Sequence, residues 1–435
     1  MVKLPLEGIR AVEVGTAWAA PAAAQALGYL GAEVIKVDFV DYWQSQGRGS
    51  VARPTKEMIS SAVPVSGGYP RGEPGKHPWN VWPIFVSQGC NKLGMTVKDL
   101  ANPKGREIFL RLIKKSDIFI ENNHPDTVKK LNLDYDVLKS VKPDIIVVRL
   151  PACGLSGAFR SYRTHGTQLD ALSGHASLRG YPDVGSAGNP DVFPSDYLGG
   201  AYGALAALLA LYYRQRTGKG QLIEVAQLES LPGCLGEAMM DYFMNGRVHQ
   251  ALGNRDIHEA APCGCYPCKG DDEWVNITVT SEEEWEAFKQ VLGNPPWMED
   301  KCFANAYRRW QNQDELDKFI KEWTIKHDKY EITHLLQKEG VPAGPVMRAG
   351  DSYSDVHLKE REFFQEVTHE DAGTHLYPTT GWKFSKTPIR IRRPPVRFGG
   401  DNEYVYKELL GVSDEEYAEF VKEGHISTEP SADIP

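Results

Sequence analysis

The sequence predicts an α/β protein whose first half forms an open parallel sheet with helices on both faces. One observation is a strand–helix–strand pattern at the N-terminus that occupies about 30 residues, the size of one parallel βαβ unit. A second is that apolar strand patterns and amphipathic helix patterns continue to alternate to about residue 150. A third is the length of 435 residues, which exceeds one ordinary domain and predicts at least a second one.

The first βαβ unit consists of a strand at 9–15 (IRAVEVG), a helix in WAAPAAAQALGYLGA and a strand in EVIKVD. The turn GTAWAAP lacks the G-x-G-x-x-G pattern, which disfavours a nicotinamide dinucleotide. Residues 40–80 are polar and rich in Gly, Pro and Ser, and predict a long functional or mobile loop. The alternation then resumes, with a helix at 103–116, a strand at 117–122, a helix at 126–133 and a strand at 144–150.

The most apolar stretch is YLGGAYGALAALLALYY, residues 197–213. Its length is at the lower limit for spanning a bilayer, but its Gly and Ala content favours a closely packed, buried helix. Further on, EWVNITVT at 273–280 predicts a strand, and the capping boxes in SEEEWEAFKQVLG and SDEEYAEFVKEG predict two helices. Residues 240–345 are therefore expected to form a separate, smaller α/β domain.

Composition excludes several classes of function. The net charge of −9 disfavours nonspecific nucleic-acid binding, because such binding depends on Lys and Arg neutralising phosphates. The N-terminus has no signal-peptide pattern, and seven cysteines without framework spacing are typical of a reducing cytoplasm. HEAAPCGCYPC, at 258–268, could offer zinc ligands, but a single C-x-C-x-x-C without a second pair favours a strand entering a turn. We expect no nucleic acid, no membrane and no metal.

One carboxylate, Asp170, lies in the small, turn-prone segment THGTQLDALSG (164–174) with no charged neighbour. Taken alone, it is most simply the N-cap of a helix that begins at Ala171. It could instead form an acid–base pair with His165. These residues by themselves leave both interpretations open.

Several stretches taken together, in order along the chain, resemble the family III CoA-transferases, the carnitine and formyl-CoA transferase type. They are LEGIRAVEVGTAWAAPAAAQALGYLGAEVIKVD, CNKLGMTVKD, IFIENNHPDTVKKLNL, THGTQLDALSG, RTGKGQLIEVAQLES, GVPAGPV and SKTPIRIRRPPVRFGGDNEYVYKELLGVSDEEYAEFVKEG. The resemblance implies a large Rossmann-like, CoA-binding domain at 1–215 that is completed by 400–425. It also implies a small α/β domain at 240–345, linkers at 216–239 and 346–399, and two chains threaded as interlocked rings.

The resemblance also implies chemistry. Asp170 would attack the donor thioester to give a mixed anhydride and then an aspartyl-CoA thioester, and the acceptor acid would reverse these steps. Coenzyme A would enter and leave as a thioester, with succinyl-CoA as a candidate donor and a bulky or aromatic acid such as benzylsuccinate as a candidate acceptor. The chain would act as a homodimer or with a paralogous subunit.

Two alternatives remain. The same fold hosts acyl-CoA racemases, in which an aspartate follows the histidine directly; here that position is Gly166, which cannot exchange a proton. The third possibility is a catalytically silent, CoA-binding subunit of a hetero-oligomeric transferase.

By register with the family, CoA contacts are expected to follow the strands, at Ala17, Trp18, Val97, Lys98, Asn122, Asn123, Lys130 and Arg149. Phe39 stands where the family often has a phosphate-binding arginine, so Lys36, Lys98 or Arg392 are candidates to replace it. Trp18 stands where some members have a glutamine. Together with the tryptophans of the 40–80 segment, it indicates an apolar or aromatic acyl group.

Overall fold

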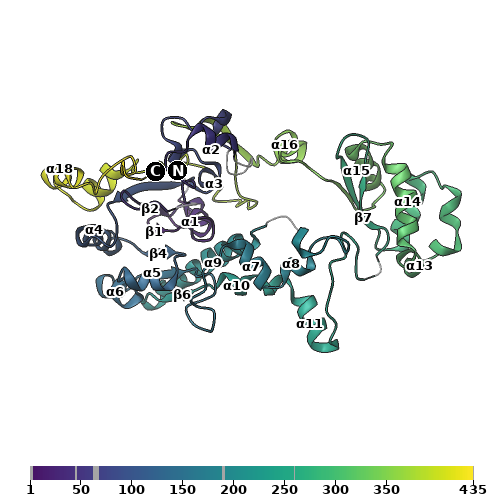
Figure 1. The fold of residues 1–435 in the computed structure, drawn as a ribbon, viewed down its shortest axis with the longest axis horizontal. Helices are drawn as coiled ribbons and strands as arrows, with labels where there is room; N and C mark the ends of the chain where they lie inside the picture. Colours follow the sequence, from purple (N-terminus) through teal and green to yellow (C-terminus); the bar gives the residue numbers. More distant parts are fainter. Residues whose placement is uncertain (1–2, 45–46, 62–67, 189–191, 259, 435) are drawn as a thin grey trace. The chain divides into compact units, whose positions relative to one another are not determined.

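The computed structural model describes residues 3–44, 47–61, 68–188, 192–258 and 260–434 (Figure 1). The chain forms two compact units. Unit 1 comprises Met1–His175, Asp191–Met244 and Glu360–Pro435, and unit 2 comprises Ala176–Pro190 and Asn245–Lys359. Each unit has its own sheet and its own apolar core.

Unit 1 is built on a six-stranded sheet in which every neighbouring pair is parallel, which confirms the predicted α/β class. Its strands are β1 (Arg10–Val14), β2 (Glu33–Phe39), β3 (Lys92–Val97), β4 (Ile118–Glu121), β5 (Ile146–Arg149) and β6 (Leu222–Glu224). The strand order is β3-β2-β1-β4-β5-β6. From β1, the chain adds β2 and β3 on one side of the sheet and then β4, β5 and β6 on the other. The position between β1 and β4 is therefore the topological switch point.

Helices cover both faces of this sheet because alternate strand residues point to opposite sides. Ala11 and Val34 pack against α1 (Ala19–Tyr29) and α9 (Pro194–Thr217). Val12 and Ile35 point the other way, into a core shared with the second helix layer. That layer contains α4 (Pro103–Lys114), α5 (Pro125–Lys130), α6 (Tyr135–Val141), the π-helical turn Tyr404–Leu409 and α18 (Asp414–Lys422). In Figure 1, α1 and α4 lie on opposite sides of β1.

Small residues bring α9 unusually close to α1. A Cβ added to Gly200 would lie 2.8 Å from the Ala22 side chain, closer than real Cβ atoms approach, and 3.0 Å from the Ala19 carbonyl oxygen. A Cβ at Gly203 would lie 2.9 Å from the Leu150 side chain. The apolar stretch predicted as a buried helix is thus confirmed as a helix, within the 24 residues of α9, but it is buried on one face only. Its Gly and Ala face packs inward, whereas Leu205, Leu209 and Tyr212 are exposed. Within the described residues, no helix is long and apolar enough to cross a membrane.

The other elements of unit 1 are short. They are α2 (Lys56–Ser61), α3 (Pro83–Gln88), α7 (Gly166–Leu172), α10 (Gln227–Ser230), α11 (Gly236–Asn245), the hairpin β10 (Phe364–His369) and β11 (Gly373–Pro378), and 3₁₀ turns at Pro70–Gly72, Pro78–Asn80 and Pro232–Cys234. In its described residues, the 40–80 segment, predicted as a loop, contains the helix α2 and the 3₁₀ turns at Pro70–Gly72 and Pro78–Asn80. A short helix, α8 (His175–Leu178), follows α7.

Unit 2 holds an antiparallel sheet in the order β7-β8-β9, with helices packed on it. The strands are β7 (Cys263–Pro267), β8 (Trp274–Thr278) and β9 (Ala343–Pro345). The helices are α12 (Glu282–Val291), α13 (Ala306–Gln311), α14 (Gln313–Thr324), α15 (Lys329–Lys338), α16 (Ala349–Ser354) and α17 (Val356–Glu360), and 3₁₀ turns occur at Ser186–Gly188, Pro296–Glu299 and Lys301–Phe303. The strand predicted at 273–280 is confirmed. Of the capping box predicted at Ser281, the N-cap is confirmed, since the Ser281 hydroxyl accepts from the Glu284 N–H, but the Glu284 carboxylate accepts from the Thr280 N–H instead of that of Ser281.

Candidate active site

The switch point is built by the turn after β1 and the residues after β4. Asn122 grips this turn, since its side-chain oxygen accepts from the Thr16 N–H at 3.0 Å and its amide donates to the Thr16 carbonyl at 2.8 Å. The Asn123 amide donates to the Val14 carbonyl at 3.0 Å. Both asparagines expected to contact CoA thus lie at the switch point, where ligands of open α/β sheets bind. Their side-chain amides, however, are hydrogen-bonded to the backbone of the turn.

The turn presents Ala17 and Trp18, two further predicted contacts. Ala17 has φ of 54°, a left-handed conformation that is costly for a residue with a side chain. Trp18 is the N-cap residue of α1, and its ring packs edge-on against Phe193, with centroids 4.5 Å apart, and near-parallel to Tyr197 at 5.9 Å. Its indole N–H is buried and has no hydrogen-bond partner among the described residues. This strained turn therefore holds an aromatic cluster, Trp18, Phe193 and Tyr197.

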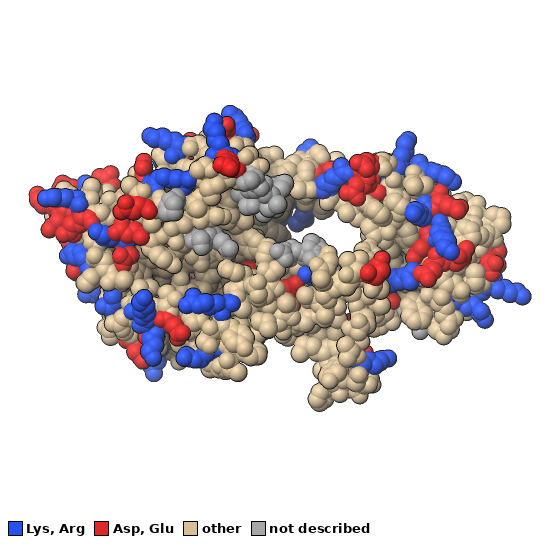
Figure 2. Space-filling view, viewed as in Figure 1, with Lys and Arg blue, Asp and Glu red and all other residues tan. Residues whose placement is uncertain are grey.

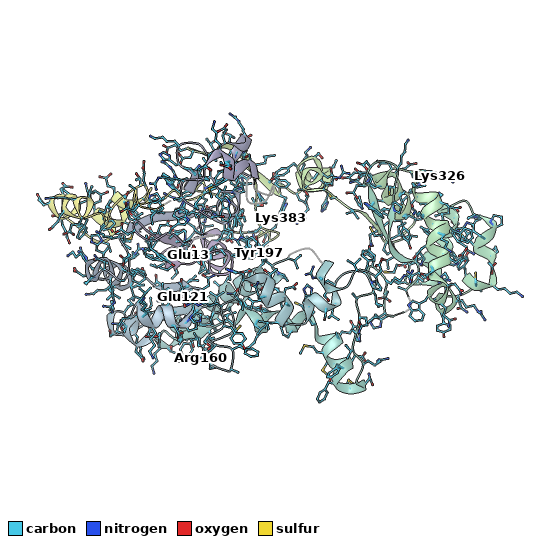
Figure 3. All side chains as sticks on the ribbon, in the orientation of Figure 1. Glu13, Glu121, Arg160, Tyr197, Lys326 and Lys383 are labelled. Atoms are coloured by element: carbon cyan, nitrogen blue, oxygen red, sulfur yellow. The ribbon has the colours of Figure 1, made fainter. Side chains whose placement is uncertain are left out.

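A buried cluster of charged side chains on β1, β2 and β3 also holds the turn after β1. Glu13, labelled in Figure 3, receives ion pairs from Lys92 at 2.5 Å and Lys36 at 3.5 Å. The Lys36 ammonium also donates to the Gly15 carbonyl, and the Lys92 ammonium to the Pro21 carbonyl, so both lysines tie the sheet to the turn. Burial lowers the pKa of Lys92, and the Glu13 carboxylate works against that effect. The buried Lys36 ammonium is thus engaged by the Glu13 carboxylate and the Gly15 carbonyl, and it is not available to bind a CoA phosphate in place of the arginine that Phe39 replaces.

A carboxylate that sequence reasoning missed lies beside the aromatic cluster. Asp196 is in the first turn of α9, between Phe193 and Tyr197, and is 8% exposed. Its carboxyl group has no hydrogen-bond or ion-pair partner among the described residues, and burial raises its pKa to about 6. The N-terminus of a long helix favours the ionised form. The predicted apolar helix was started at Tyr197, three residues after the start of α9 at Pro194; the sequence Pro-Ser-Asp is the signal that could have extended it.

The helix α7 begins at Gly166, so the prediction that Asp170 caps a helix starting at Ala171 is wrong. The N-cap residue is His165, whose backbone N–H donates to the Gln168 side chain at 2.8 Å. Asp170 lies within the helix and is buried, and its carboxylate is hydrogen-bonded to Nδ1 of His175. His175, rather than His165, is thus the histidine paired with this aspartate.

Gly166 is where α7 meets the start of α9. A Cβ built on Gly166 would collide with the Asp196 carboxylate and lie 2.6 Å from the Phe193 ring. The glycine therefore makes room for Asp196. Gly166 stands at the sequence position of the racemase aspartate and carries no carboxylate. In the structure, the Asp196 carboxylate of α9 lies where a side chain at position 166 would lie.

The remaining predicted contacts spread along the same edge of the sheet. Val97 is buried at the end of β3, and Lys98 follows it, partly exposed and 3.8 Å from the Asp41 carboxylate. Lys130 is the exposed last residue of α5. Arg149 is buried at the end of β5, where its Nε pairs with Glu121 at 2.6 Å while one terminal nitrogen has no partner among the described residues. Because β3 lies two strands from β1, Lys98 is about 10 Å from the switch point.

Arg392 does not face this edge. Its guanidinium donates to the carbonyl of Tyr29 at 3.2 Å and to that of Gly28, at the C-terminal end of α1. It therefore caps a helix at the opposite edge of the sheet from the switch point. Of the three candidate replacements for the missing arginine, Lys98 alone stands after a strand with a partly exposed ammonium.

In unit 2, the cysteine-rich stretch forms strand β7 and its following turn. Cys263 donates from its thiol to the Asn254 carbonyl at 3.1 Å, and Cys268 is buried in the core. Across the described ranges, no group of three or more His, Cys, Asp or Glu side chains is arranged to hold a metal ion.

The chain belongs to the family III CoA-transferases: the model of this family matches residues 6–402. Enzymes of this class use CoA thioesters as substrates. The membership confirms the resemblance drawn from the ordered motifs.

Among its relatives, the β subunit of succinyl-CoA–L-malate CoA-transferase from Chloroflexus aurantiacus is 29% identical over 95% of this chain and 96% of its own length. Formyl-CoA:oxalate CoA-transferase from Bradyrhizobium diazoefficiens is 25% identical over 97% of both chains. The crystal structure of a CAIB/BAIF family protein from Brucella suis has the same fold, with a TM-score of 0.77, 24% identity and coverage of 93% of this chain and 99% of that one.

Proposed function

We propose that this enzyme moves CoA from an acyl-CoA to a carboxylic acid through a covalent aspartyl-CoA thioester on Asp196. The observation that carries the proposal is the buried Asp196 carboxylate, which has no partner among the described residues and lies beside the switch point. With a pKa of about 6, roughly 90% of it is ionised at pH 7, so it needs no general base. Burial removes the water that would otherwise screen the nucleophile and hydrolyse its intermediates.

The steps balance with this one residue. The Asp196 carboxylate attacks the thioester carbonyl, the C–S bond breaks, and a mixed anhydride and CoA thiolate result. The thiolate attacks the aspartyl carbonyl of the anhydride, releasing the donor acid and leaving aspartyl-CoA. The acceptor carboxylate attacks this thioester and expels the thiolate again, and the thiolate then takes the acceptor's acyl group and frees Asp196.

Asp170, which the sequence favoured as nucleophile, is the alternative. It lies one helical turn after Gly166 in α7, and its carboxylate is hydrogen-bonded to His175. A carboxylate engaged in such a hydrogen bond is a weaker nucleophile than one without a partner. The geometry therefore supports Asp196 in this role and Asp170 as a positioning residue in the neighbouring helix.

Trapping distinguishes the two aspartates. The enzyme is incubated with succinyl-CoA, a donor chosen because several relatives carry it in their names, and treated with hydroxylamine, which converts an aspartyl thioester into a hydroxamate. Peptide mass spectrometry should place the hydroxamate on Asp196. It should disappear in Asp196→Asn and persist in the matched Asp170→Asn. A hydroxamate on Asp170 would restore the original assignment.

A racemase remains the second candidate, because the Asp196 carboxylate lies against Gly166, the position of the racemase aspartate. A racemase exchanges the α-proton of an acyl-CoA without an acceptor acid. Incubating a 2-methylacyl-CoA in deuterated water with no added acid tests this: we expect no deuterium at the α-carbon, and incorporation at a rate matching turnover would favour the racemase.

We further propose that the chain works as an assembly, with the interlocked homodimer as the expected form. Supporting this, α11 exposes Met239, Met240, Phe243 and Met244, with Phe243 84% exposed. Figure 2 shows mostly uncharged side chains where α11 lies. An exposed patch of this kind marks an interface. Analytical ultracentrifugation of the purified chain should give a dimer. A monomer without transferase activity that recovers on adding a paralogous chain would indicate a hetero-oligomer.

A further inference from the structure

We infer that the aromatic cluster Trp18, Phe193 and Tyr197 selects acids with an aromatic ring, and that the Trp18 indole N–H binds the oxygen of the acyl group being transferred. This inference rests on the proposed role of Asp196. It narrows the apolar or aromatic acyl group expected from the sequence to an aromatic one and adds a hydrogen-bond donor, and it makes Trp18 the residue that determines specificity.

The first support is the position of the cluster. Phe193 and Tyr197 flank Asp196 in the first turn of α9, and Trp18 packs against both rings from the turn after β1. Any acyl group bonded to the Asp196 carboxylate must lie beside these rings. Tyr197, labelled in Figure 3, is 54% exposed, so the cluster is partly open rather than a closed core.

The second support is the Trp18 nitrogen. It is buried and lacks an acceptor within the described chain, although a buried N–H without a partner is costly and is rarely left so. An acyl oxygen at Asp196 is an acceptor of the right kind, because it gains negative charge as the tetrahedral intermediate forms. A donor that is already in place and shielded from bulk water stabilises that charge with little reorganisation once the acyl group displaces its neighbours.

The third support is the rigidity of this arrangement. Trp18 follows a residue held at φ of 54°, and Asn122 clamps the preceding Thr16 with two hydrogen bonds. Because Gly166 has no side chain, the Phe193 ring and the Asp196 carboxylate can both pack against its Cα. The rings and the carboxylate are thus fixed relative to one another, as discrimination between a flat ring and a puckered one requires. Aromatic ring pairs are favoured over aliphatic contacts of similar area.

The test uses succinyl-CoA as donor and two acceptors of matched size, phenylacetate and cyclohexylacetate. For the wild-type enzyme, kcat/KM for phenylacetate should exceed that for cyclohexylacetate about tenfold. Trp18→Leu should bring this ratio close to one. Trp18→Phe keeps a ring but removes the N–H, so it should retain the preference while lowering kcat about 10- to 100-fold for both acids. Trp310→Phe, a matched change in unit 2, should alter neither.

The outcomes separate this inference from the proposed function. If neither acid is converted and no aspartyl hydroxamate forms from succinyl-CoA, the proposed function itself is overturned, and the inference with it. If both acids are converted equally well, or if Trp18→Leu leaves the ratio unchanged, the enzyme is a transferase but the aromatic cluster does not select. If Trp18→Phe leaves kcat intact, the indole N–H is not the donor. Circular dichroism of each variant excludes misfolding.

Discussion

Replacing Asp196 by asparagine should make the protein more stable at neutral pH while abolishing transfer. The carboxyl group is buried without a partner among the described residues, and its pKa is raised from 3.8 to about 6. At about 1.4 kcal/mol for each pH unit, this difference amounts to about 3 kcal/mol of unfolding free energy that the ionised carboxylate costs the native state. An uncharged amide of nearly the same shape does not carry this cost.

The sign follows from proton binding. Between pH 3.8 and about 6, the native state holds a proton on Asp196 that the unfolded state has lost, so wild-type stability falls as pH rises through this window. Asp196→Asn lacks this dependence. The stability gained by the variant should therefore be near zero at pH 3.5 and rise to about 3 kcal/mol at pH 7.

Urea unfolding of both proteins without CoA, followed by tryptophan fluorescence at several pH values, measures this difference. Asp136→Asn serves as a control, because Asp136 is exposed, and its effect should stay within about 0.5 kcal/mol at every pH. A stability difference that is the same at pH 3.5 and pH 7, or a variant less stable than wild type at pH 7, would refute the idea of an uncompensated buried carboxylate.

Three further predictions follow from the same site. Because Asp196 must be ionised to attack, kcat/KM should fall tenfold for each pH unit well below about 6, and a flat profile down to pH 5 would contradict its role. Asn122→Ala should lose two hydrogen bonds to the turn, costing about 1–3 kcal/mol in urea unfolding and lowering transfer through a misplaced Trp18. Gly200→Ala should cost about 1–3 kcal/mol in thermal or urea unfolding, because its Cβ would collide with α1. Gly236→Ala, with nothing within 4 Å of its Cβ, should be neutral or mildly stabilising; equal effects of the two glycine changes would argue against close helix packing.

Much of the fold was predictable because its signals are local. The strands β1, β2, β4 and β5 are short apolar runs, and α9 is a long run of Gly, Ala and Leu, so residue patterns alone identified them. β3 was not among the strands predicted from the residue patterns, and its first residue, Lys92, is charged. In the structure this lysine is buried because Glu13, 79 positions earlier, neutralises it.

The candidate site was predicted only in part. The turn after β1 and the asparagines after β4 were identified, since family register and the rule for open sheets both point to strand ends. The sequence analysis named Asp170 as the candidate nucleophile and did not consider Asp196, which the structure adds as a second candidate. The burial and the side-chain partners that distinguish the two carboxylates are not readable from the residues that flank them.

The sequence by itself determined the class of this protein: its ordered motifs establish a family III CoA-transferase, and its alternating patterns establish a parallel α/β sheet. Only the tertiary structure distinguished the two aspartates, because the difference between them is one of partners. Asp170 is hydrogen-bonded to His175, whereas Asp196 is buried beside Gly166 and an aromatic cluster formed by the start of α9 and the turn after β1. A carboxylate's reactivity depends on what surrounds it in space, and those neighbours come from positions far apart in the chain.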